Sequence, residues 1–235
     1  MKVIILSGGY GTRLSEYTDA IPKPMVKIGD LPILVHIMKS YSKYNFNDFV
    51  IALGYKGEMI KKYFEKNSTN WNIKLIDTGE KTMTGGRLKR LKEEIGNETF
   101  MLTYGDGLSN INIKKLLEFH KENKKIVTVT AVRPPARFGY IKFKDEKVIG
   151  FKEKSKLDVG WINGGFFVME PEFLNYIEGD ETYLEREPIE KVVKENNLCA
   201  YKHSGFWQCM DTLREKKLLN QIYKSKKNMS PWIKK

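Results

Sequence analysis

The sequence predicts an α/β fold: a mostly parallel mixed sheet between two layers of helices, with a small β-rich second lobe. Up to Val132, short apolar runs alternate with amphipathic helical segments, as expected for a parallel sheet that is covered on both faces. A Gly-rich loop directly follows the first apolar run. After Val132 the pattern changes to a Pro-rich link, RPPARFGY, and two short apolar runs around a turn at 144–147, which predicts a hairpin.

The individual elements follow from hydrophobic periodicity. Strands are expected at 3–6, 49–53, 73–76, 100–103, 127–132, 140–143, 148–152 and 166–169. Helices are expected where apolar residues recur at three- and four-residue spacing, at 33–44, 58–65, 88–95, 113–122, 188–195 and 212–223. One domain therefore covers residues 1–235, with halves at 1–132 and 133–235. The basic tail KSKKNMSPWIKK is expected to attach loosely, with Trp232 packing back onto the body.

Composition excludes several classes of protein. A chain of 235 residues, 41% of them hydrophobic, can form a packed globular domain. No apolar run approaches the roughly 20 residues of a membrane span, and the first run is too short for a secretory signal. The net charge of +12 comes largely from scattered lysines, so we expect phosphorylated small molecules and not nucleic acid as partners. Cys199 and Cys209 show no metal-binding or disulfide pattern, which fits a reducing cytoplasm.

The stretch LSGGYGTRL, at 6–14, has the glycine content of a phosphate-binding loop between a strand and a helix. It lacks the last glycine of a dinucleotide fingerprint, GxGxxG, and a Walker A sequence, GxxxxGK[ST], is absent. Two separately placed cations suit a substrate that carries several phosphates: Arg13 directly behind the loop, and Lys23 between the prolines of PKPM. An ordinary exposed loop lysine is the alternative for Lys23.

The pair of motifs GGYGTRL and PKPM resembles the signature of the sugar-1-phosphate nucleotidyltransferases, or NDP-sugar pyrophosphorylases. The similarity covers nearly the whole chain and is strongest to that family's glucose-1-phosphate cytidylyltransferases, through PILVHIMKSYS, GYKGEMIKKYF, DTGEKTMTGGRLKR, TYGDGL, WINGGFFVMEP and GFWQCMDTLREK. The resemblance implies a Rossmann-like nucleotidyltransferase α/β/α sandwich, with a nucleotide-binding first half and a sugar-phosphate-binding second half. It also implies Mg²⁺ and the reaction of an NTP with a sugar-1-phosphate to give an NDP-sugar and pyrophosphate, with CTP and glucose-1-phosphate favoured.

The resemblance further implies roles for individual residues. Lys23 and Arg13 would be catalytic: Lys23 would stabilise charge on the α-phosphate and the attacking phosphate, and Arg13 would hold the departing pyrophosphate. The nucleotide-binding residues would be Leu6, Gly8, Gly9, Gly11, Thr12, Thr84, Gly85 and Gly105. The sugar-phosphate-binding residues would be Gly139, Glu153, Lys154 and Asn163. Asp106 and Asp211 would be the metal ligands.

Several of these residues also fit ordinary structural roles. Asp106 begins an Asp-Gly pair that is typical of turns, and Asp211 precedes a helix as an N-cap does. Thr84 suits a helix N-cap as well as a place against the base, and Arg87 either reaches a phosphate or starts the helix. Taken alone, Glu153 and Lys154 would be a solvated charge pair.

Two features depart from the family pattern. Cys209 stands where the family's FWQPMDT has proline, and the segment at 65–74 is shorter than in the cytidylyltransferases. Because of these departures, the nucleotide could also be UTP, GTP or dTTP, and the sugar phosphate could be a mannose or heptose phosphate. Assembly into a homo-oligomer is also left open.

Two other classes of protein are less consistent with the sequence. An NDP-sugar-dependent glycosyltransferase would usually carry a DxD motif, whereas Tyr104-Gly-Asp106 has one carboxylate. A non-catalytic sugar-nucleotide-binding protein is disfavoured because the four charged site residues are all present.

Overall fold

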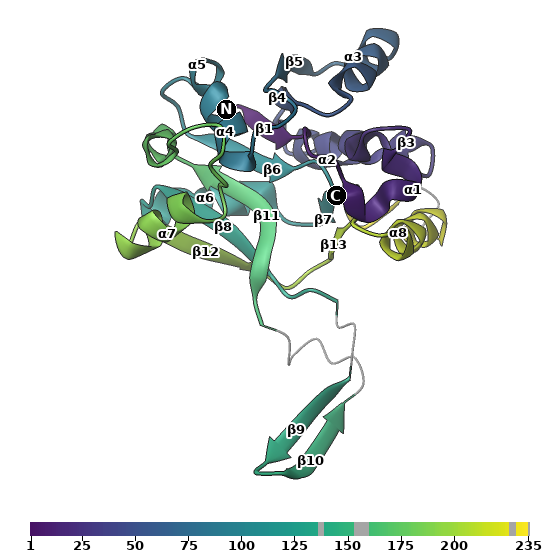
Figure 1. Ribbon diagram of the computed structural model, residues 1–235, viewed down its shortest axis with the longest axis vertical. Helices are drawn as coiled ribbons and strands as arrows, with labels where there is room; N and C mark the ends of the chain where they lie inside the picture. Colours follow the sequence, from purple (N-terminus) through teal and green to yellow (C-terminus); the bar gives the residue numbers. More distant parts are fainter. Residues whose placement is uncertain (136–138, 153–159, 226–228, 235) are drawn as a thin grey trace.

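The computed structural model describes residues 1–135, 139–152, 160–225 and 229–234, and it is built around one seven-stranded sheet (Figure 1). The strand order is β12-β8-β11-β6-β1-β4-β5. These strands are β1 (Val3–Leu6), β4 (Asp48–Leu53), β5 (Asn72–Asp77), β6 (Phe100–Tyr104), β8 (Val127–Val132), β11 (Ile162–Met169) and β12 (Leu198–His203). Only β11 runs antiparallel to its neighbours in this sheet, so the predicted mostly parallel mixed sheet is confirmed.

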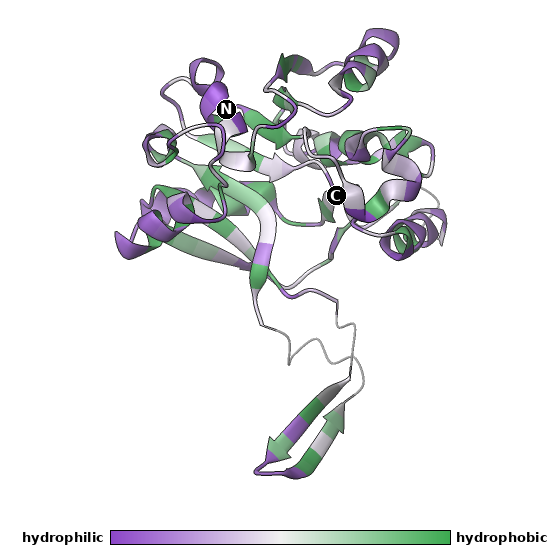
Figure 2. Cartoon of the chain, viewed as in Figure 1, coloured by the Kyte–Doolittle hydropathy of each residue, from purple (hydrophilic) through white to green (hydrophobic). Residues whose placement is uncertain are grey.

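The central strand β1 shows why its sequence is apolar throughout. All four of its residues are buried, and they alternate between the two faces of the sheet. Val3 and Ile5 pack in one hydrophobic cluster, together with side chains from α2, α3, α6 and α8. Ile4 and Leu6 pack in the other cluster, together with α4, α5 and α7. The sheet is therefore covered on both faces, and Figure 2 shows the central strands as the most apolar part of the chain.

The helices lie close to their predicted positions. They are α1 (Ser15–Thr18), α2 (Ile33–Ser42), α3 (Gly57–Lys66), α4 (Thr84–Arg90), α5 (Lys92–Ile95), α6 (Ile113–Asn123), α7 (Glu187–Lys194) and α8 (Leu213–Ser225), with 3₁₀ turns at Thr12–Leu14, Lys23–Met25 and Pro171–Tyr176. The single helix expected at 88–95 is divided into α4 and α5 at Leu91, and it begins earlier, at Thr84. No helix among the described residues has the length and apolar character of a membrane span.

Within the described parts of the chain there are also three two-stranded sheets: β2 (Lys27–Ile28) with β3 (Leu31–Pro32), β7 (Gly107–Ser109) with β13 (Trp207–Cys209), and β9 (Tyr140–Lys144) with β10 (Lys147–Lys152). The β9–β10 hairpin forms as predicted and projects away from the main sheet (Figure 1). The rest of the second half does not form a separate lobe, because β11 and β12 are members of the main sheet. Strand β12 was missed from the sequence, since its apolar residues neither alternate strictly nor run continuously.

The C-terminal segment is anchored by one aromatic side chain. Trp232 is fully buried, and its indole Nε1 donates a hydrogen bond to Nδ1 of His36 at 3.2 Å. The Nε2 atom of His36 faces the carbonyl oxygen of Ile28 at 2.8 Å. The expectation that Trp232 packs back is therefore confirmed.

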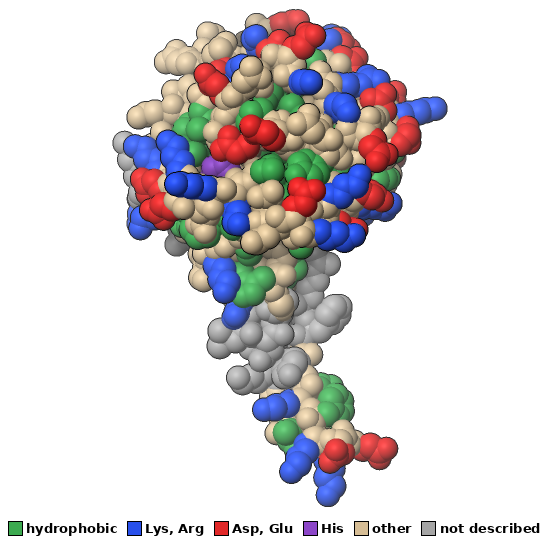
Figure 3. Space-filling model, turned by 90° about the vertical axis from the view of Figure 1, so that its left-hand side faces the viewer, with side chains coloured by type: hydrophobic (Ala, Val, Ile, Leu, Met, Phe, Trp, Pro, Cys, Tyr) green, Lys and Arg blue, Asp and Glu red, His purple; other side chains and the backbone are tan. Residues whose placement is uncertain are grey.

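The charged side chains of the surface are mixed in sign. On the face shown in Figure 3, basic and acidic side chains are interspersed, as the scattered lysines of the sequence predicted.

Candidate active site

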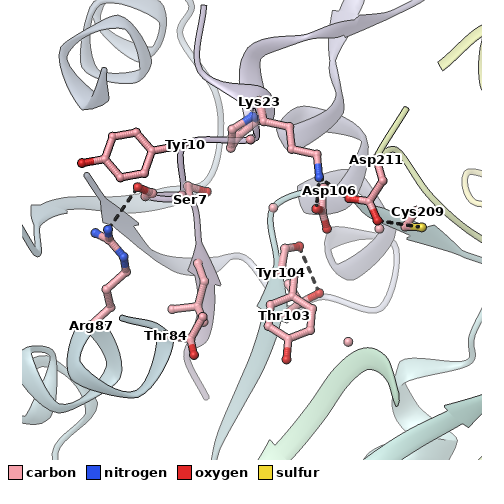
Figure 4. Close-up of a pocket in the computed structure, with 18 of the residues that line it drawn as sticks. Ser7, Tyr10, Lys23, Thr84, Arg87, Thr103, Tyr104, Asp106, Cys209 and Asp211 are labelled. Carbon is pink, nitrogen blue, oxygen red and sulfur yellow. Dashed lines mark hydrogen bonds and ion pairs between the residues drawn. The ribbon is translucent and has the colours of Figure 1, made fainter. Parts of the chain in front are cut away.

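A cleft of about 670 Å³ opens at the carboxyl ends of β1 and β6 (Figure 4). Ligands bind at this end of the strands in open α/β sheets. Its walls come from segments far apart in the sequence: the Gly-rich loop, the PKPM turn, the segment before α4, and the residues that follow β6 and β13. Twelve of the sixteen residues proposed from the sequence line this cleft: Leu6, Gly8, Gly9, Gly11, Thr12, Arg13, Lys23, Thr84, Gly105, Asp106, Asn163 and Asp211.

The Gly-rich loop needs its glycines at two points in particular. Gly11 has a φ of +65°, in the left-handed region, and a Cβ there would lie 2.9 Å from Cγ2 of Thr18. A Cβ on Gly8 would lie 2.2 Å from the guanidinium of Arg87. Gly9 has open space at the corresponding position, with nothing within 4 Å. The loop is therefore tightly packed at both ends and open to the cleft between them, as a backbone that receives a phosphate must be.

Lys23 lies at the centre of a group of four charges. Its Nζ is 2.5 Å from Oδ2 of Asp106 and 2.5 Å from Oδ1 of Asp211. The other oxygen of Asp211, Oδ2, pairs with Arg13 at 2.9 Å. Lys23 is buried, whereas the side chain of Arg13 is 72% exposed at the mouth of the cleft. Lys23 is thus a buried site residue, and the alternative of an exposed loop lysine is wrong.

The pKa values in this group follow from burial and charge. Burial lowers the pKa of Lys23, but the carboxylates of Asp106 and Asp211 raise it by more, so the pKa of the ammonium is raised overall. Burial raises the pKa of Asp211, but Lys23 and Arg13 lower it by more, so the pKa of this carboxyl is lowered overall. Both groups are therefore held in their charged forms at neutral pH.

The two carboxylates are brought together by the pairing of β7 with β13. Asp106 follows β6 and immediately precedes β7, whereas Asp211 lies two residues after β13, and the backbone N–H of Met210 donates to the carbonyl of Asp106 at 2.9 Å. Both carboxylates reach one ammonium group, so their oxygens converge as the ligands of a hard divalent cation do. This donor set fits Mg²⁺, which takes one or two carboxylates together with phosphate oxygens and water.

Thr212 and Glu215, and not Asp211, cap helix α8. The Glu215 carboxylate accepts hydrogen bonds from the backbone N–H groups of Asp211 and Thr212, at 2.7 and 3.0 Å, and the Thr212 hydroxyl accepts from the N–H of Glu215 at 3.4 Å. The N-cap alternative for Asp211 is therefore wrong.

Cys209 lies beside Asp211, with its Sγ 3.6 Å from Oδ2. Burial has the largest effect on this thiol and the nearby carboxylates add to it, so that its pKa is raised to about 12. A thiol in this state is not a nucleophile at neutral pH.

Arg87 neither starts the helix nor points freely toward a phosphate. It is buried, and its guanidinium donates to the carbonyl oxygens of Gly8 and Leu53, each at 3.0 Å, and to those of Gly79 and Glu80 at 2.6 and 3.0 Å. Gly8 lies in the loop after β1, Leu53 is the last residue of β4, and Gly79 and Glu80 lie in the loop after β5. Arg87 therefore ties the end of β4 to the loops after β1 and β5 at the carboxyl edge of the sheet, and the loop after β1 is the Gly-rich loop.

Thr84 is the first residue of α4, and its hydroxyl donates to the carboxylate of Glu185 at 2.7 Å, so it is not an N-cap. Glu185 also accepts from the hydroxyl of Tyr104 at 2.6 Å. Neither Tyr104 nor Glu185 was predicted from the sequence as a site residue. Tyr104 could have been found, because it ends the strand that precedes Asp106 by two residues, but nothing in the local pattern of TYLEREP distinguishes Glu185.

The four remaining predicted residues are not among the described residues that line this cleft. Gly85 packs against another segment, since a Cβ there would lie 2.7 Å from the carbonyl oxygen of Thr182, and it is not among the described residues that line the cleft. Gly139 is not among them either, and it immediately precedes the β9–β10 hairpin. Glu153 and Lys154 lie outside the described residues.

The chain matches the family model described as nucleotidyl transferase over residues 2–212. It belongs to that family. The transferase is 45% identical to a glucose-1-phosphate cytidylyltransferase of Salmonella typhimurium, in an alignment that covers 99% of this chain and 98% of the relative. It is 42% identical to a probable glucose-1-phosphate cytidylyltransferase of Bacillus subtilis, over 95% of this chain and 96% of the relative. The resemblance seen in the sequence is therefore confirmed.

Solved structures show the same fold at lower identity. The transferase resembles HddC from Yersinia pseudotuberculosis, crystallised in complex with GMP-PN, with a TM-score of 0.76 at 23% identity over 94% of this chain and 98% of that chain. The predicted Rossmann-like nucleotidyltransferase fold is confirmed. The alignment with the Salmonella enzyme spans 255 positions, more than the 235 residues of this chain, so the relative carries residues that are missing here.

Proposed function

We propose that this transferase moves the cytidylyl group of CTP onto glucose-1-phosphate, giving CDP-glucose and pyrophosphate. The observation that carries the proposal is the convergence of Lys23 and Arg13 with Asp106 and Asp211 beside a phosphate-type loop. The substrates are proposed by analogy with the two relatives, whose names are glucose-1-phosphate cytidylyltransferase and probable glucose-1-phosphate cytidylyltransferase.

The reaction depends on placing the two phosphate groups in line and on stabilising their negative charge, more than on proton transfer. An oxygen of the sugar phosphate attacks the α-phosphorus of CTP in line with the departing pyrophosphate, and this oxygen is already ionised at neutral pH, so no general base is needed. Lys23 stabilises the charge shared by the α-phosphate and the attacking phosphate. Arg13, exposed at the mouth of the cleft, holds the pyrophosphate together with the N–H groups of the Gly-rich loop.

Mg²⁺ is the proposed cofactor, with Asp106 and Asp211 as the residues that would hold it. When bound, it would neutralise phosphate charge in the cleft. Leu6, Gly8, Gly9, Gly11, Thr12, Thr84 and Gly105 are the proposed nucleotide contacts within the cleft. For the sugar phosphate we propose Asn163, which lies in the cleft, together with Gly139, Glu153 and Lys154.

Release of pyrophosphate tests the proposal directly. CTP, UTP, GTP and dTTP are each combined with glucose-1-phosphate, mannose-1-phosphate and a heptose-1-phosphate, and each component is also assayed alone. We expect release only when an NTP and a sugar phosphate are both present, and fastest release with CTP and glucose-1-phosphate. Release from CTP alone, or none with any pair, would overturn the proposal, and a faster pair would correct the substrates.

We further propose that the enzyme forms a homo-oligomer through the β9–β10 hairpin. Ile141 and Phe143 pair across the hairpin with Phe151 and Val148, which places four apolar side chains on one face, each between 42% and 65% exposed. A two-stranded hairpin is marginally stable alone in water and gains from having such a face covered. A double variant, Phe143→Lys with Phe151→Lys, should reduce the mass measured by light scattering to that of a monomer. A monomeric wild type would reject the proposal.

We also propose a cytoplasmic location, which the state of the two cysteines supports. Cys199 and Cys209 are both free thiols. Unpaired thiols are typical of proteins that work in a reducing compartment. Fractionation of the cells that produce the protein tests this location, and recovery of the enzyme outside the cytoplasmic fraction would reject it.

A further inference from the structure

Four side chains form a continuous hydrogen-bonded chain along one wall of the cleft. The amide Nδ2 of Asn163 donates to the hydroxyl of Tyr104 at 3.2 Å, and that hydroxyl donates to Oε1 of Glu185 at 2.6 Å. The hydroxyl of Thr84 donates to the other carboxylate oxygen, Oε2, at 2.7 Å. Thr84, Tyr104 and Asn163 line the cleft, and Glu185, an exposed residue that is not among the lining residues, joins the first to the other two.

The carboxylate of Glu185 fixes the direction of both hydroxyl hydrogens. An ionised carboxylate only accepts hydrogen bonds, and each hydroxyl has one hydrogen to give, so the hydrogens of Thr84 and Tyr104 both point toward Glu185. The oxygen of Thr84 also accepts from the backbone N–H of Leu184 at 2.9 Å, which leaves it one lone pair. Toward a ligand, Thr84 is therefore an acceptor and not a donor.

Neighbouring contacts hold this arrangement in place. The Tyr104 ring packs edge to face on Phe167, with centroids 6.0 Å apart, and a Cβ on Gly165 would lie 2.5 Å from the same ring. On the other side, the backbone around Thr84 is tied to the segment that carries Glu185, because the N–H of Gly85 donates to the carbonyl of Thr182 at 2.9 Å. The oxygen atoms of both hydroxyls are therefore held close to Glu185.

We propose that Glu185 is a specificity-determining residue, which acts by holding Thr84 as a hydrogen-bond acceptor toward the nucleotide base. The inference rests on the proposed function, in which Thr84 contacts the nucleotide. Cytosine presents an exocyclic amino group, a donor, where uracil presents a carbonyl oxygen, an acceptor. An oxygen that can only accept binds the amino group and leaves the carbonyl facing another acceptor, which disfavours UTP.

The test compares the dissociation constants of CTP and UTP by titration calorimetry. Glu185→Ala removes both carboxylate acceptors and frees the Thr84 hydrogen to turn toward a carbonyl. The preference for CTP over UTP should therefore fall by about tenfold. Thr84→Val, which removes the acceptor, should reduce the preference by a similar factor, whereas Thr84→Ser, which keeps a hydroxyl, should retain it. Glu187→Ala, two residues away and exposed, is the matched control and should behave as wild type.

The ratio of the two dissociation constants distinguishes this role from a merely structural one, because loss of local order would weaken the binding of CTP and UTP by the same factor. An unchanged ratio in Glu185→Ala and Thr84→Val would overturn the inference, as would a wild type that binds both nucleotides equally. The result does not depend on turnover. If wild type bound CTP preferentially but released no pyrophosphate, the proposed function would fail while the role of Glu185 could still be confirmed.

Discussion

Lys23 and Asp211 are 188 positions apart in the chain, and yet Nζ of the first lies 2.5 Å from Oδ1 of the second. The same Nζ is equally close to Asp106, so one buried ammonium joins two carboxylates. These charges are largely removed from water. Replacing only one of them therefore costs stability, because the charges that remain are buried without a partner.

Replacing Lys23 removes the cation proposed to act on the transferred phosphate. We expect Lys23→Ala to lower kcat by about 10²–10³, as loss of a transition-state donor does in other enzymes. Lys27→Ala is the matched control, because Lys27 is exposed in the adjacent strand β2. The measurement is pyrophosphate release at saturating substrates. Turnover of the Lys23 variant at the wild-type rate would contradict the role.

Asp211→Ala tests the proposed metal ligands. With one of two carboxylates removed, we expect half-maximal activity to require at least about tenfold more Mg²⁺. Asp30→Ala, which changes an exposed carboxylate, should leave the Mg²⁺ titration as in wild type. Binding of Mn²⁺ in the presence of CTP, followed by electron paramagnetic resonance, gives a second measurement that does not depend on turnover. A wild-type titration curve for Asp211→Ala would reject this ligand.

Arg87→Met leaves the carbonyl groups of Gly8, Leu53, Gly79 and Glu80 without their buried donor. We expect a loss of about 3 kcal/mol in the free energy of unfolding, together with a higher KM for the nucleotide, because the Gly-rich loop loses its anchor at Gly8. Lys92→Met, on an exposed side chain of the next helix, controls for loss of charge. Thermal unfolding and nucleotide kinetics measure the two effects. An unchanged KM would show that Arg87 does not position the loop.

Acid should destabilise the fold through His36. Burial lowers the pKa of this histidine, although its hydrogen bond to the Ile28 carbonyl partly offsets the effect. Because the folded pKa lies below the unfolded value of about 6.5, the unfolded chain takes up a proton first as pH falls. Stability contributed by neutral His36 is therefore present above about pH 6.5 and declines below it, by at most about 1.4 kcal/mol per pH unit.

The His36→Phe variant isolates this contribution. The slope of unfolding free energy against pH, measured by denaturant titration between pH 5 and 7, should be shallower than in wild type. Some slope should remain, because burial also lowers the pKa of His203. Equal slopes in the two proteins would show that His36 titrates alike in the folded and unfolded chains.

Local patterns in the sequence were sufficient for most of the sheet and for the chemistry of the site. A fully buried central strand such as β1 is a continuous apolar run, and a phosphate loop needs glycines at fixed places, so both can be recognised within about ten residues. Strand β12 could not be recognised from its local sequence, because it lies at the edge of the sheet. An edge strand exposes part of its surface and needs no strict apolar pattern.

Sequence patterns and motifs were enough to predict the fold class, the family, and the residue types of the site, including Arg13, Lys23, Asp106 and Asp211. How these residues meet depends on the folded chain, in which β7 pairs with β13 and brings the two aspartates to one lysine. The folded chain also determines the partners of residues outside this group. It also decided that Arg87 binds carbonyl groups, and that Glu185 reaches Thr84 and Tyr104. Periodicity and turn preferences act over a few residues, whereas these contacts depend on the order of strands in the sheet and on loops that the folded chain brings together.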